Sequence, residues 1–380
     1  MKPDTLLIVT SSFPDRGDGS EAAGAFVEDI ARELGRWIPV RVVAPGRVPG
    51  EVNDGDGFQV RRFASPGKPL SLLSPMSPKD WPAIAQVLMS LRREALAAAS
   101  DGRVAHVLAL WALPSGWAAR TIESRLGIPY STWVLGSDIW SLGKLPLVRS
   151  LLRRILLDSR RRFADGMLLG ADAGRIAGAD FEFLSSARSL DLPARHAPRA
   201  KPPYELLYLG RWHPNKGIDL LLDALEALDD DAWSKISTMH IAGGGLLEPL
   251  VHAKVRALLA EGRPVRLSGY LGREQAAAAL CQADYLVIPS RVESIPVVFS
   301  DALQAGCAIV STPVGDLPDL FGADPPGILA GAADADSLAQ ALRHALDSPP
   351  ASFAAAVEGL RGRFSVRDNI APRLRALVDS

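Results

Sequence analysis

Short β-type runs of apolar residues alternate with segments of helical period from one end of the chain to the other. This alternation is typical of parallel sheets covered by crossover helices, so it predicts an α/β fold. The expected strands are 6–10, 40–44, 60–63, 105–110, 130–135 and 166–169 in the first half, and 205–210, 238–242, 265–268, 285–288 and 308–311 in the second. The expected helices are 24–37, 82–99, 115–126, 146–163, 217–228, 246–261, 273–282 and 296–305. Two separate sheets fit this series better than one.

The length of 380 residues and a hydrophobic content of 48% supply enough apolar material for two or three folded domains, which excludes a disordered chain. No apolar run reaches the ~18 residues that a membrane-spanning helix needs, and the first apolar stretch is too short for a secretory signal. We therefore expect a cytoplasmic protein. The two cysteines, Cys281 and Cys307, stand alone in apolar segments, so we expect buried thiols and neither a disulfide nor a paired-cysteine metal site.

The two halves of the chain differ in charge. Residues 1–200 hold 26 Lys and Arg against 21 Asp and Glu, whereas residues 201–380 hold 16 against 22. Neither half has the dense basic stripe of a nucleic-acid-binding domain, so we expect no nucleic-acid partner. A mildly basic first half suits an anionic acceptor or a membrane surface.

A segment rich in Pro and basic residues, 191–203, separates the two series of strands and helices. Because it has no apolar period, we expect the interdomain linker there. The expected domains are residues 1–195 and residues 204–362.

Two cations follow the first strand of the second half. Arg211 and Lys216 lie in the loop between that strand and an amphipathic helix. Ligands of open α/β sheets bind beyond the carboxyl ends of the strands, so these side chains indicate a diphosphate site. Arg binds phosphate oxygens in pairs, and Lys supplies a compact charge. The alternative interpretation is a solvated loop with ordinary surface cations.

Three consecutive glycines, Gly243, Gly244 and Gly245, join the end of the next strand to a helix. Backbone without side chains lets N–H groups approach an anion or a base. A glycine-rich turn that binds no ligand explains the same residues equally well.

The most informative segment is 283–315, where a buried strand is followed by a loop with Glu293. Pro296 marks the start of a helix, because its missing N–H would be unsatisfied in the first turn in any case. The N–H groups of Val297 and Val298 then lie at the positive end of the helix dipole, where they form a phosphate cradle. For Glu293 alone, helix capping is the simpler interpretation.

Taken together, these segments resemble the second domain of the retaining glycosyltransferases of the GT-B fold, in particular glycosyltransferase family 4. In that family a strand is followed by Gly-Arg and Lys-Gly, a glycine-rich turn, Pro-Ser, and two acidic residues separated by seven others. The matching residues of this chain are Gly210-Arg211, Lys216-Gly217, Gly243 to Gly245, Pro289-Ser290, Glu293 and Asp301. Looser similarity extends the resemblance over nearly the whole chain, at residues 11–34, 106–120, 127–140, 164–170 and 362–369.

The resemblance implies two Rossmann-like domains that face a central cleft, with a final segment, 363–380, that crosses back to the first domain. It implies a nucleotide-diphosphate sugar as the donor, a hexose as the transferred group, no further cofactor and no metal ion. The implied acceptor is a glycan, a lipid-linked molecule or a small molecule.

The resemblance also assigns roles to residues. Arg211, Lys216 and Glu293 are the expected catalytic residues, because the two cations balance the leaving diphosphate and Glu293 binds sugar hydroxyls. Asp138 is the expected acceptor-side residue, with helix capping as the alternative. The expected donor-binding residues are Gly24, Gly210, Gly243, Gly244, Tyr270, Ser294, Pro296, Val297, Val298 and Asp301.

Two positions depart from the family pattern. The family often has His where this chain has Leu135, so catalysis here does not rest on an imidazole at that position. The second acidic residue is Asp301 instead of Glu, which shortens its reach toward the ribose by one methylene.

Two segments of the first half are candidates for contact with a membrane or an acceptor. The helix expected at 146–163 combines six arginines with a leucine stripe, which suits an anionic bilayer. The simpler interpretation places Leu147, Leu151, Ile155 and Leu156 in the core and the arginines in solvent. The second candidate is the loop 71–81, which contains Leu72, Leu73 and Met76.

Two other functions compete with sugar transfer. A catalytically weak nucleotide-sugar-binding protein is favoured by Leu135 and Asp301, but the intact Arg211, Lys216 and Glu293 argue against it. A nucleotide-sugar epimerase or hydrolase usually relies on His and carboxylate residues in the cleft, and Leu135 leaves no such set.

Overall fold

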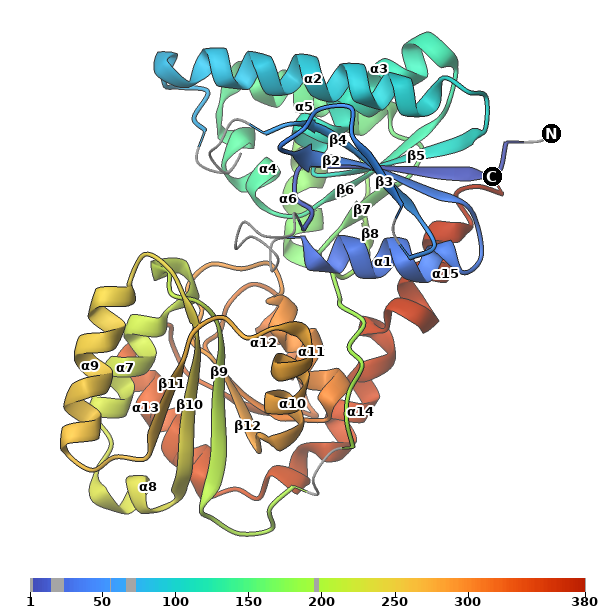
Figure 1. Ribbon diagram of the computed structural model, residues 1–380. Coiled ribbons are helices and arrows are strands. Elements are labelled where there is room, and N and C mark those ends of the chain that lie inside the picture. Colours follow the sequence, from blue (N-terminus) through green and yellow to red (C-terminus); the bar gives the residue numbers. More distant parts are fainter. Residues whose placement is uncertain (1–2, 15–23, 55, 66–72, 195–197, 380) are drawn as a thin grey trace. The chain divides into compact units, whose positions relative to one another are not determined.

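The computed structural model describes residues 3–14, 24–54, 56–65, 73–194 and 198–379. The chain forms two compact units, Met1–Ser189 with Val366–Ser380, and Leu190–Ser365. Each unit is one sheet covered by helices, so the fold is α/β with two Rossmann-like units, as the sequence predicts (Figure 1). The final helix, α15 (Ala371–Arg375), packs on α1 of the first unit, which confirms that the end of the chain crosses back.

The first unit is built on an eight-stranded sheet with the order β3-β4-β2-β1-β5-β6-β7-β8. The sheet is parallel except for β3, which pairs with β4 in the antiparallel direction. Its central strand β1 is buried along its whole length, as expected for a strand covered by helices on both faces. The strands are β1 (Thr5–Thr10), β2 (Val40–Gly46), β3 (Val52–Asp54), β4 (Gln59–Ala64), β5 (Val104–Leu110), β6 (Tyr130–Val134), β7 (Arg162–Ala164) and β8 (Glu182–Phe183).

Helices α2, α3 and α5 of the first unit pack their apolar stripes on one face of this sheet. Helix α1 lies on the opposite face (Figure 1). The helices are α1 (Ala25–Gly35), α2 (Trp81–Ala99), α3 (Trp117–Leu126), α4 (Ser137–Trp140), α5 (Pro146–Asp158) and α6 (Met167–Ala177). In the part of the chain that the structure describes, no helix is both long enough and apolar enough to cross a membrane.

The second unit contains a six-stranded, fully parallel sheet with the order β11-β10-β9-β12-β13-β14. From β9 the chain adds β10 and β11 on one side of the sheet and then β12, β13 and β14 on the other side. The strand order therefore reverses beside β9. The strands are β9 (Tyr204–Arg211), β10 (Ile236–Gly244), β11 (Val265–Ser268), β12 (Tyr285–Ile288), β13 (Ala308–Ser311) and β14 (Gly327–Leu329).

Both faces of the second sheet are covered. Helices α7, α9 and α13 share one apolar core with strands β9 and β10, and α10, α11 and α12 lie on the other face (Figure 1). The helices are α7 (Ile218–Glu226), α8 (Asp230–Ser234), α9 (Glu248–Ala260), α10 (Arg273–Gln282), α11 (Val297–Ala305), α12 (Leu317–Phe321), α13 (Ala335–Leu346) and α14 (Ala354–Arg361). Cys281 and Cys307 are both buried free thiols in this unit, as expected.

The strand predicted at 166–169 is wrong. The strand at this place is β7, Arg162–Ala164, and the predicted segment belongs to helix α6. The buried side chains of α6 are Leu169, Ala173, Ile176 and Ala177, which recur at helical spacing. A short apolar run such as Met-Leu-Leu does not distinguish a strand from a helix, and the three residues of β7 are too few to show a strand pattern.

The helix predicted at 146–163 ends earlier, at Asp158, and the core position assigned to Leu147 is wrong. Leu147 is 89% exposed, whereas Leu152, Ile155 and Leu156 are buried. The buried stripe begins at Val148, which packs against the core, and a turn of about 100° per residue directs Leu147 toward solvent.

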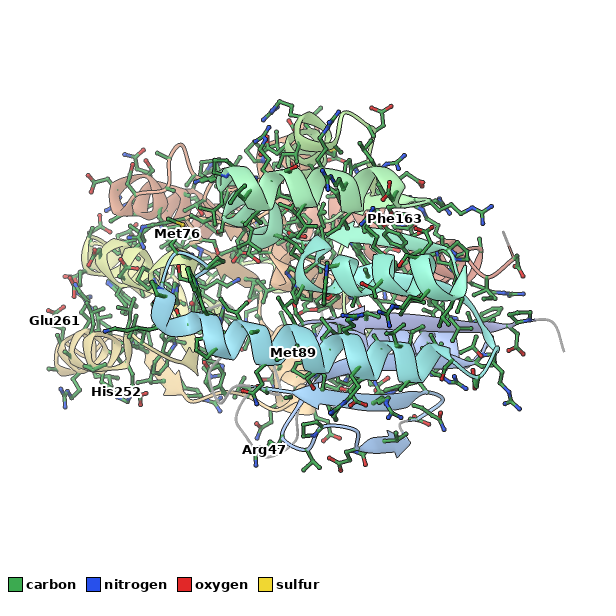
Figure 2. All side chains as sticks on the ribbon, turned by 90° about the horizontal axis from the view of Figure 1, so that it is seen from above. Arg47, Met76, Met89, Phe163, His252 and Glu261 are labelled. Carbon is green, nitrogen blue, oxygen red and sulfur yellow. The ribbon has the colours of Figure 1, made fainter. Side chains whose placement is uncertain are left out.

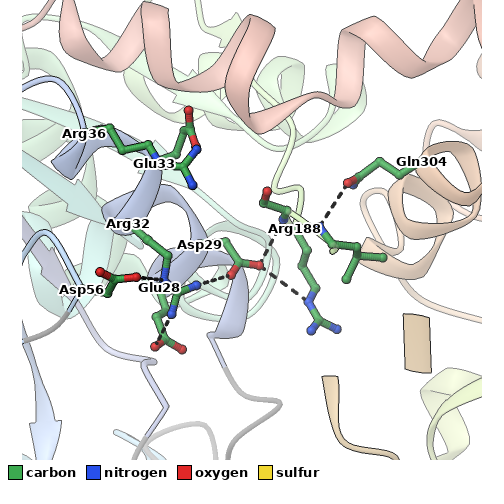
Figure 3. Close-up of polar contacts among 10 residues, drawn as sticks. Glu28, Asp29, Arg32, Glu33, Arg36, Asp56, Arg188 and Gln304 are labelled. Atoms are coloured by element: carbon green, nitrogen blue, oxygen red, sulfur yellow. Dashed lines mark hydrogen bonds and ion pairs between the residues drawn. The ribbon is translucent and has the colours of Figure 1, made fainter. Parts of the chain in front are cut away.

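A buried carboxylate fixes the last residues of the first unit to helix α1. Asp29 accepts a hydrogen bond from the backbone N–H of Ser189 at 3.1 Å and pairs with Arg32 of its own helix at 3.3 Å. Arg188 approaches the same carboxylate at 3.9 Å, as Figure 3 shows. Because the side chain of Asp29 has no solvent access, these partners supply the hydrogen bonds and charge that water would otherwise provide.

Candidate active site

Three loops of the second unit leave the carboxyl ends of neighbouring parallel strands. Strands β9, β10 and β12 pair directly, with β9 in the middle. Parallel strands bring their carboxyl ends to one edge of the sheet, which is where open α/β sheets bind ligands. The loops after these three strands carry most of the site residues that the sequence predicts.

The loop after β9 presents the two predicted cations. Arg211 ends the strand and is exposed, and its guanidinium makes no hydrogen bond or ion pair with any described residue. Lys216 ends a short 3-10 turn that begins at Pro214. Gly217 follows with φ 67°, and a Cβ there would lie 1.8 Å from the carbonyl oxygen of Pro289, so this position requires glycine. The close approach brings the loop after β9 against the loop after β12.

Lys216 and Glu293 meet across these two loops. The ammonium of Lys216 forms an ion pair and hydrogen bond with the Glu293 carboxylate. Both side chains are partly accessible, at 27% for Lys216 and 18% for Glu293, so a ligand can reach both. Two of the three predicted catalytic residues are therefore direct neighbours.

The glycines at the end of β10 pack against the protein's own chain. A Cβ at Gly243 would lie 1.9 Å from the carbonyl oxygen of Gly210, which excludes any larger residue there. The ring of Tyr270 covers Gly244 and would lie 2.8 Å from a Cβ at that position. The Tyr270 hydroxyl also donates a hydrogen bond to the Gly244 carbonyl at 2.7 Å. Close packing thus accounts for these glycines, and their contact with a donor stays a prediction.

Helix α11 opens toward the same edge of the sheet. Pro296 is the residue immediately before the helix, and not its first residue, because its ψ of 129° is extended. The N–H groups of Val297 and Val298 form no hydrogen bond with any described residue. They therefore lie at the positive end of the helix dipole, and the phosphate cradle that they would form stays a prediction. Ser294 is buried, and its carbonyl accepts a hydrogen bond from the N–H of Asp316 at 3.1 Å.

Asp301 lies within α11 and is only 1% exposed. In this structure its carboxylate is therefore inside the unit and not at an open surface. Its role in holding the ribose stays a prediction.

Sequence reasoning did not single out Arg291, Asp219 or Tyr208, which support the site. Arg291 and Asp219 form a two-pronged ion pair with nitrogen-oxygen distances of 2.8 and 2.6 Å. The Tyr208 hydroxyl donates to the backbone carbonyl of Arg211 at 2.9 Å and so fixes the end of the strand. Burial raises the pKa of Tyr208, and the nearby negative charges add to the effect, so this phenol stays protonated and remains a donor. Arg291 and Asp219 are 72 positions apart, and no periodic pattern in the sequence indicates that two such distant residues form a pair.

In the first unit, Gly24 precedes helix α1 with φ 72°, and a Cβ there would lie 2.4 Å from the carbonyl oxygen of Ser12. Only glycine fits this position, because backbone lies against it. The predicted approach of Gly24 to donor phosphates stays a prediction.

Asp138 is buried in the first unit and binds backbone. Its carboxylate accepts from the N–H groups of Ala112 at 2.7 Å, Gly136 at 3.1 Å and Leu135 at 3.3 Å. Burial raises the pKa of Asp138 to about 6, against the opposing effect of these hydrogen bonds. Asp138 lies in the first turn of α4, whose N-cap is Gly136, so its carboxylate holds backbone that precedes the helix and is not the N-cap of the alternative interpretation. The acceptor-side role stays a prediction.

The loop predicted at 71–81 is described only in part. Ser71 and Leu72 lie outside the described residues. Leu73 is half-buried, whereas Met76 is 72% exposed, and Figure 2 labels it with Met89 of α2. Among the residues that the structure describes, no group of three or more His, Cys, Asp or Glu side chains is placed to hold a metal ion.

These features define a class of protein: two Rossmann-like units, the second with cations and a helix N-terminus at the carboxyl edge of its sheet. The comparisons with known proteins agree with this class.

Residues 203–348 match the family profile described as "Glycosyl transferases group 1". The glycogen synthase of Mycobacterium tuberculosis is 32% identical over 161 residues, which cover 42% of this chain and 37% of that protein. The D-inositol 3-phosphate glycosyltransferase of Streptomyces avermitilis is 32% identical over 152 residues, which cover 38% and 33%. The matched segments thus span little more than a third of these relatives.

Solved structures extend the likeness to the whole fold. Sucrose-phosphate synthase from Thermosynechococcus elongatus has a TM-score of 0.73 at 17% identity, over 99% of this chain and 98% of that one. The Anabaena protein HepE in complex with UDP-glucose has a TM-score of 0.68 at 14% identity, over the same shares. The family match thus covers residues 203–348, the part of the chain that carries the motifs, and the whole chain has the GT-B fold, as the sequence predicts.

Proposed function

We propose that the protein is a retaining glycosyltransferase that moves a hexose from a nucleotide-diphosphate sugar to a glycan, a lipid-linked molecule or a small-molecule acceptor. The observations that carry the proposal are the Lys216–Glu293 pair and the N–H groups of Val297 and Val298, which both follow the carboxyl ends of strands of one parallel sheet. Arg211, at the end of β9, adds a cation whose guanidinium has no partner among the described residues.

The chemistry requires these groups. When the bond between sugar and diphosphate breaks, positive charge develops on the sugar ring and negative charge grows on the leaving diphosphate. Arg211, Lys216 and the two helix N–H groups stabilise that negative charge, and each such preorganised donor is worth about 2.7–4 kcal/mol in the transition state. In this proposal the protein supplies the whole of the charge, without a metal ion.

Glu293 has two tasks in this mechanism. Its carboxylate accepts hydrogen bonds from sugar hydroxyls and so orients the ring. Its ion pair with Lys216 holds the ammonium in place before the donor arrives. A donor phosphate oxygen takes the proton from the acceptor hydroxyl, so the reaction needs no imidazole at Leu135.

The donor is inferred from relatives. HepE is described in complex with UDP-glucose and with UDP and glucose, and two similar structures are a sucrose-phosphate synthase and a lipopolysaccharide galactosyltransferase. These names favour a nucleoside-diphosphate hexose, with UDP-glucose as the first donor to test. Asp301 as a ribose-binding group and Tyr270 beside the base belong to the proposal.

A donor panel tests the function. Purified protein is incubated with UDP-, ADP-, GDP- and dTDP-hexoses, and released nucleotide is measured with and without simple sugar and lipid acceptors. Transfer with retained anomeric configuration supports the proposal. Nucleotide binding without release indicates a binding protein, whereas a changed sugar on an unbroken nucleotide indicates an epimerase, and release to water alone indicates a hydrolase.

We also propose that helix α5 makes peripheral contact with an anionic membrane. Leu147 and Leu157 are exposed on this helix, and three exposed arginines, Arg149, Arg153 and Arg154, have no ion-pair partner among the described residues. Exposed leucines beside cations suit an interface of anionic lipid. Co-sedimentation with phosphatidylglycerol vesicles, but not with phosphatidylcholine vesicles, is the expected result, and Arg153→Glu with Arg154→Glu abolishes it. Equal recovery with both vesicle types contradicts the contact.

A further inference from the structure

Arg291 lies where the loop after β9 meets the loop after β12. It is two residues before Glu293, and the loop that it contacts carries Lys216. The two catalytic side chains proposed above therefore stand on separate loops, and something must fix the distance between these loops.

The backbone of Arg291 makes the first connection. Its N–H donates to the carbonyl oxygen of Asn215 at 2.8 Å, and the N–H of Val292 donates to the same oxygen at 3.4 Å. Asn215 is the residue immediately before Lys216. The chain around Glu293 is thus joined directly to the chain around Lys216.

The side chain of Arg291 makes the second connection. One terminal nitrogen donates to the Pro214 carbonyl at 2.7 Å and to one Asp219 carboxylate oxygen at 2.8 Å. The other donates to the second Asp219 oxygen at 2.6 Å. Asp219 stands in the first turn of α7, so the guanidinium links the loop after β12 to the first residue of the 3-10 turn that presents Lys216 and to the helix that follows this turn.

This arrangement is stronger than an ordinary surface pair. The Arg291 and Asp219 side chains are only 33% and 27% exposed, and paired nitrogen-oxygen bonds fix direction as well as distance. Burial alone would raise the pKa of Asp219, but the hydrogen bonds and charge of Arg291 outweigh it and hold the pKa below its usual value. The pair therefore remains ionised across the neutral pH range.

We infer that Arg291, together with Asp219, is a positioning pair that sets the separation of Lys216 and Glu293 for sugar transfer. This inference rests on the proposed function. Arg291 acts through the two loops and makes no contact with the reacting atoms, since its terminal nitrogens already bind protein oxygens.

A positioning role predicts a particular kinetic pattern. A Lys side chain on a loosened loop still reaches a bound diphosphate, whereas the transition state needs both charged groups in fixed places. Misplacement of catalytic groups by ~1 Å costs about 100-fold in rate. Arg291→Ala should therefore lower kcat by about 100-fold, while the Kd for UDP rises by about tenfold or less.

The chain offers a matched control at the opposite end of the same two strands. Arg199 pairs with Asp284 at 2.7 Å and with Glu205 at 2.8 Å, beside the amino ends of β12 and β9. Its side chain has similar exposure, at 40%. Arg199→Ala removes an equivalent ion pair from the same unit, and it should leave kcat within about twofold of the parent when both proteins are folded.

Three further variants separate positioning from simple loss of charge. Arg291→Lys keeps the charge but loses the two-pronged geometry, so it should recover only part of the rate. Asp219→Ala should reproduce the Arg291→Ala rate, and the double variant should be no slower than either single one, because the two residues act as one unit. Additive losses in the double variant would overturn the pairing.

Hydrogen exchange gives a measurement that does not depend on activity. The N–H groups of Lys216 and Gly217 bond within the 3-10 turn, to His213 at 2.8 Å and to Pro214 at 3.1 Å. Arg291→Ala should speed exchange in residues 213–217, whereas Arg199→Ala should leave it unchanged. Unchanged exchange in Arg291→Ala overturns the inference even if the parent transfers no sugar. If the parent is inactive but exchange responds, the proposed function fails and the positioning contact stands.

Discussion

The ammonium of Lys216 and the carboxylate of Glu293 are joined although the two residues are 77 positions apart in the sequence. Each belongs to a loop that leaves the carboxyl end of a strand, and these strands are adjacent in the sheet. In the described part of the chain, neither side chain has another hydrogen-bond partner. In the proposed function this pair holds a cation ready for the donor, and donor binding replaces some of the attraction between Glu293 and Lys216 with attraction between Lys216 and phosphate.

Glu293→Gln should separate binding from transfer. The variant removes the negative charge that competes with the diphosphate for Lys216, so the affinity for UDP should stay equal or tighten. Transfer should fall at least about tenfold, because the sugar loses a charged hydrogen-bond acceptor. Calorimetric titration of UDP and an initial-rate assay measure the two effects. Weaker UDP binding in this variant would show that Glu293 supports the diphosphate site and does not compete with it.

Asp301→Glu should destabilise the protein. Asp301 lies on α11 and its side chain is buried in the second unit. An added methylene in a packed interior lowers the free energy of unfolding by about 1–3 kcal/mol. Chemical denaturation of both proteins measures the loss. Asp336→Glu, at an exposed position in the first turn of α13, is the control and should change stability by less than about 0.5 kcal/mol. Full stability of Asp301→Glu, with unchanged UDP affinity, would show that Asp301 has open space beside it.

Asp138 should make stability fall as the pH rises through its titration range. Burial raises its pKa from 3.8 to about 6, so between these values the folded protein keeps a proton that the unfolded chain releases. The contribution of Asp138 is therefore present below pH 3.8 and is lost as the pH rises to about 6. His106, whose pKa burial lowers to about 4, has the opposite effect in the same range. The measurement is the difference in unfolding free energy between wild type and Asp138→Asn from pH 4 to pH 7. A difference that does not change with pH would contradict the raised pKa.

Sugar transfer should persist in excess chelator. The proposal gives charge stabilisation to Arg211, Lys216 and helix N–H groups, and none of them binds a divalent cation. Initial rates with and without EDTA should agree. Activity that disappears in EDTA and returns with Mg²⁺ or Mn²⁺ would show that a metal ion stabilises the charge of the leaving diphosphate.

Four elements of the second unit were predicted to the residue, whereas its helices α8, α12, α13 and α14 were not predicted. Strands β11, β12 and β13 and helix α10 have the expected bounds, because apolar runs of strand length end at clear turn residues. Strands β7, β8 and β14 were not predicted, because a strand of two or three residues is too short to show an alternating pattern. Helix α6 was predicted as a strand because the short apolar run at its start does not distinguish a strand from a helix.

Residue type and motif order selected Arg211, Lys216 and Glu293 as candidates, and the structure brings the last two into contact. Their catalytic roles stay predictions. The Arg291–Asp219 pair could not be predicted, because a single sequence does not show which of many Arg and Asp residues meet. Whether Asp301 is buried depends on which side of α11 faces the sheet. The spacing between Glu293 and Asp301 in the sequence does not determine which side that is.

The central claim is that Arg211 and Lys216 balance the charge of a leaving diphosphate, and the most direct measurement is nucleotide release from UDP-glucose or the best donor of the panel. Arg211→Ala and Lys216→Ala should each lower the rate at least ~100-fold, because each leaves charge unbalanced in the transition state. Arg266→Ala, which removes an exposed cation from β11 of the same unit, should keep the wild-type rate. Near-normal rates in both Arg211→Ala and Lys216→Ala would contradict the assignment.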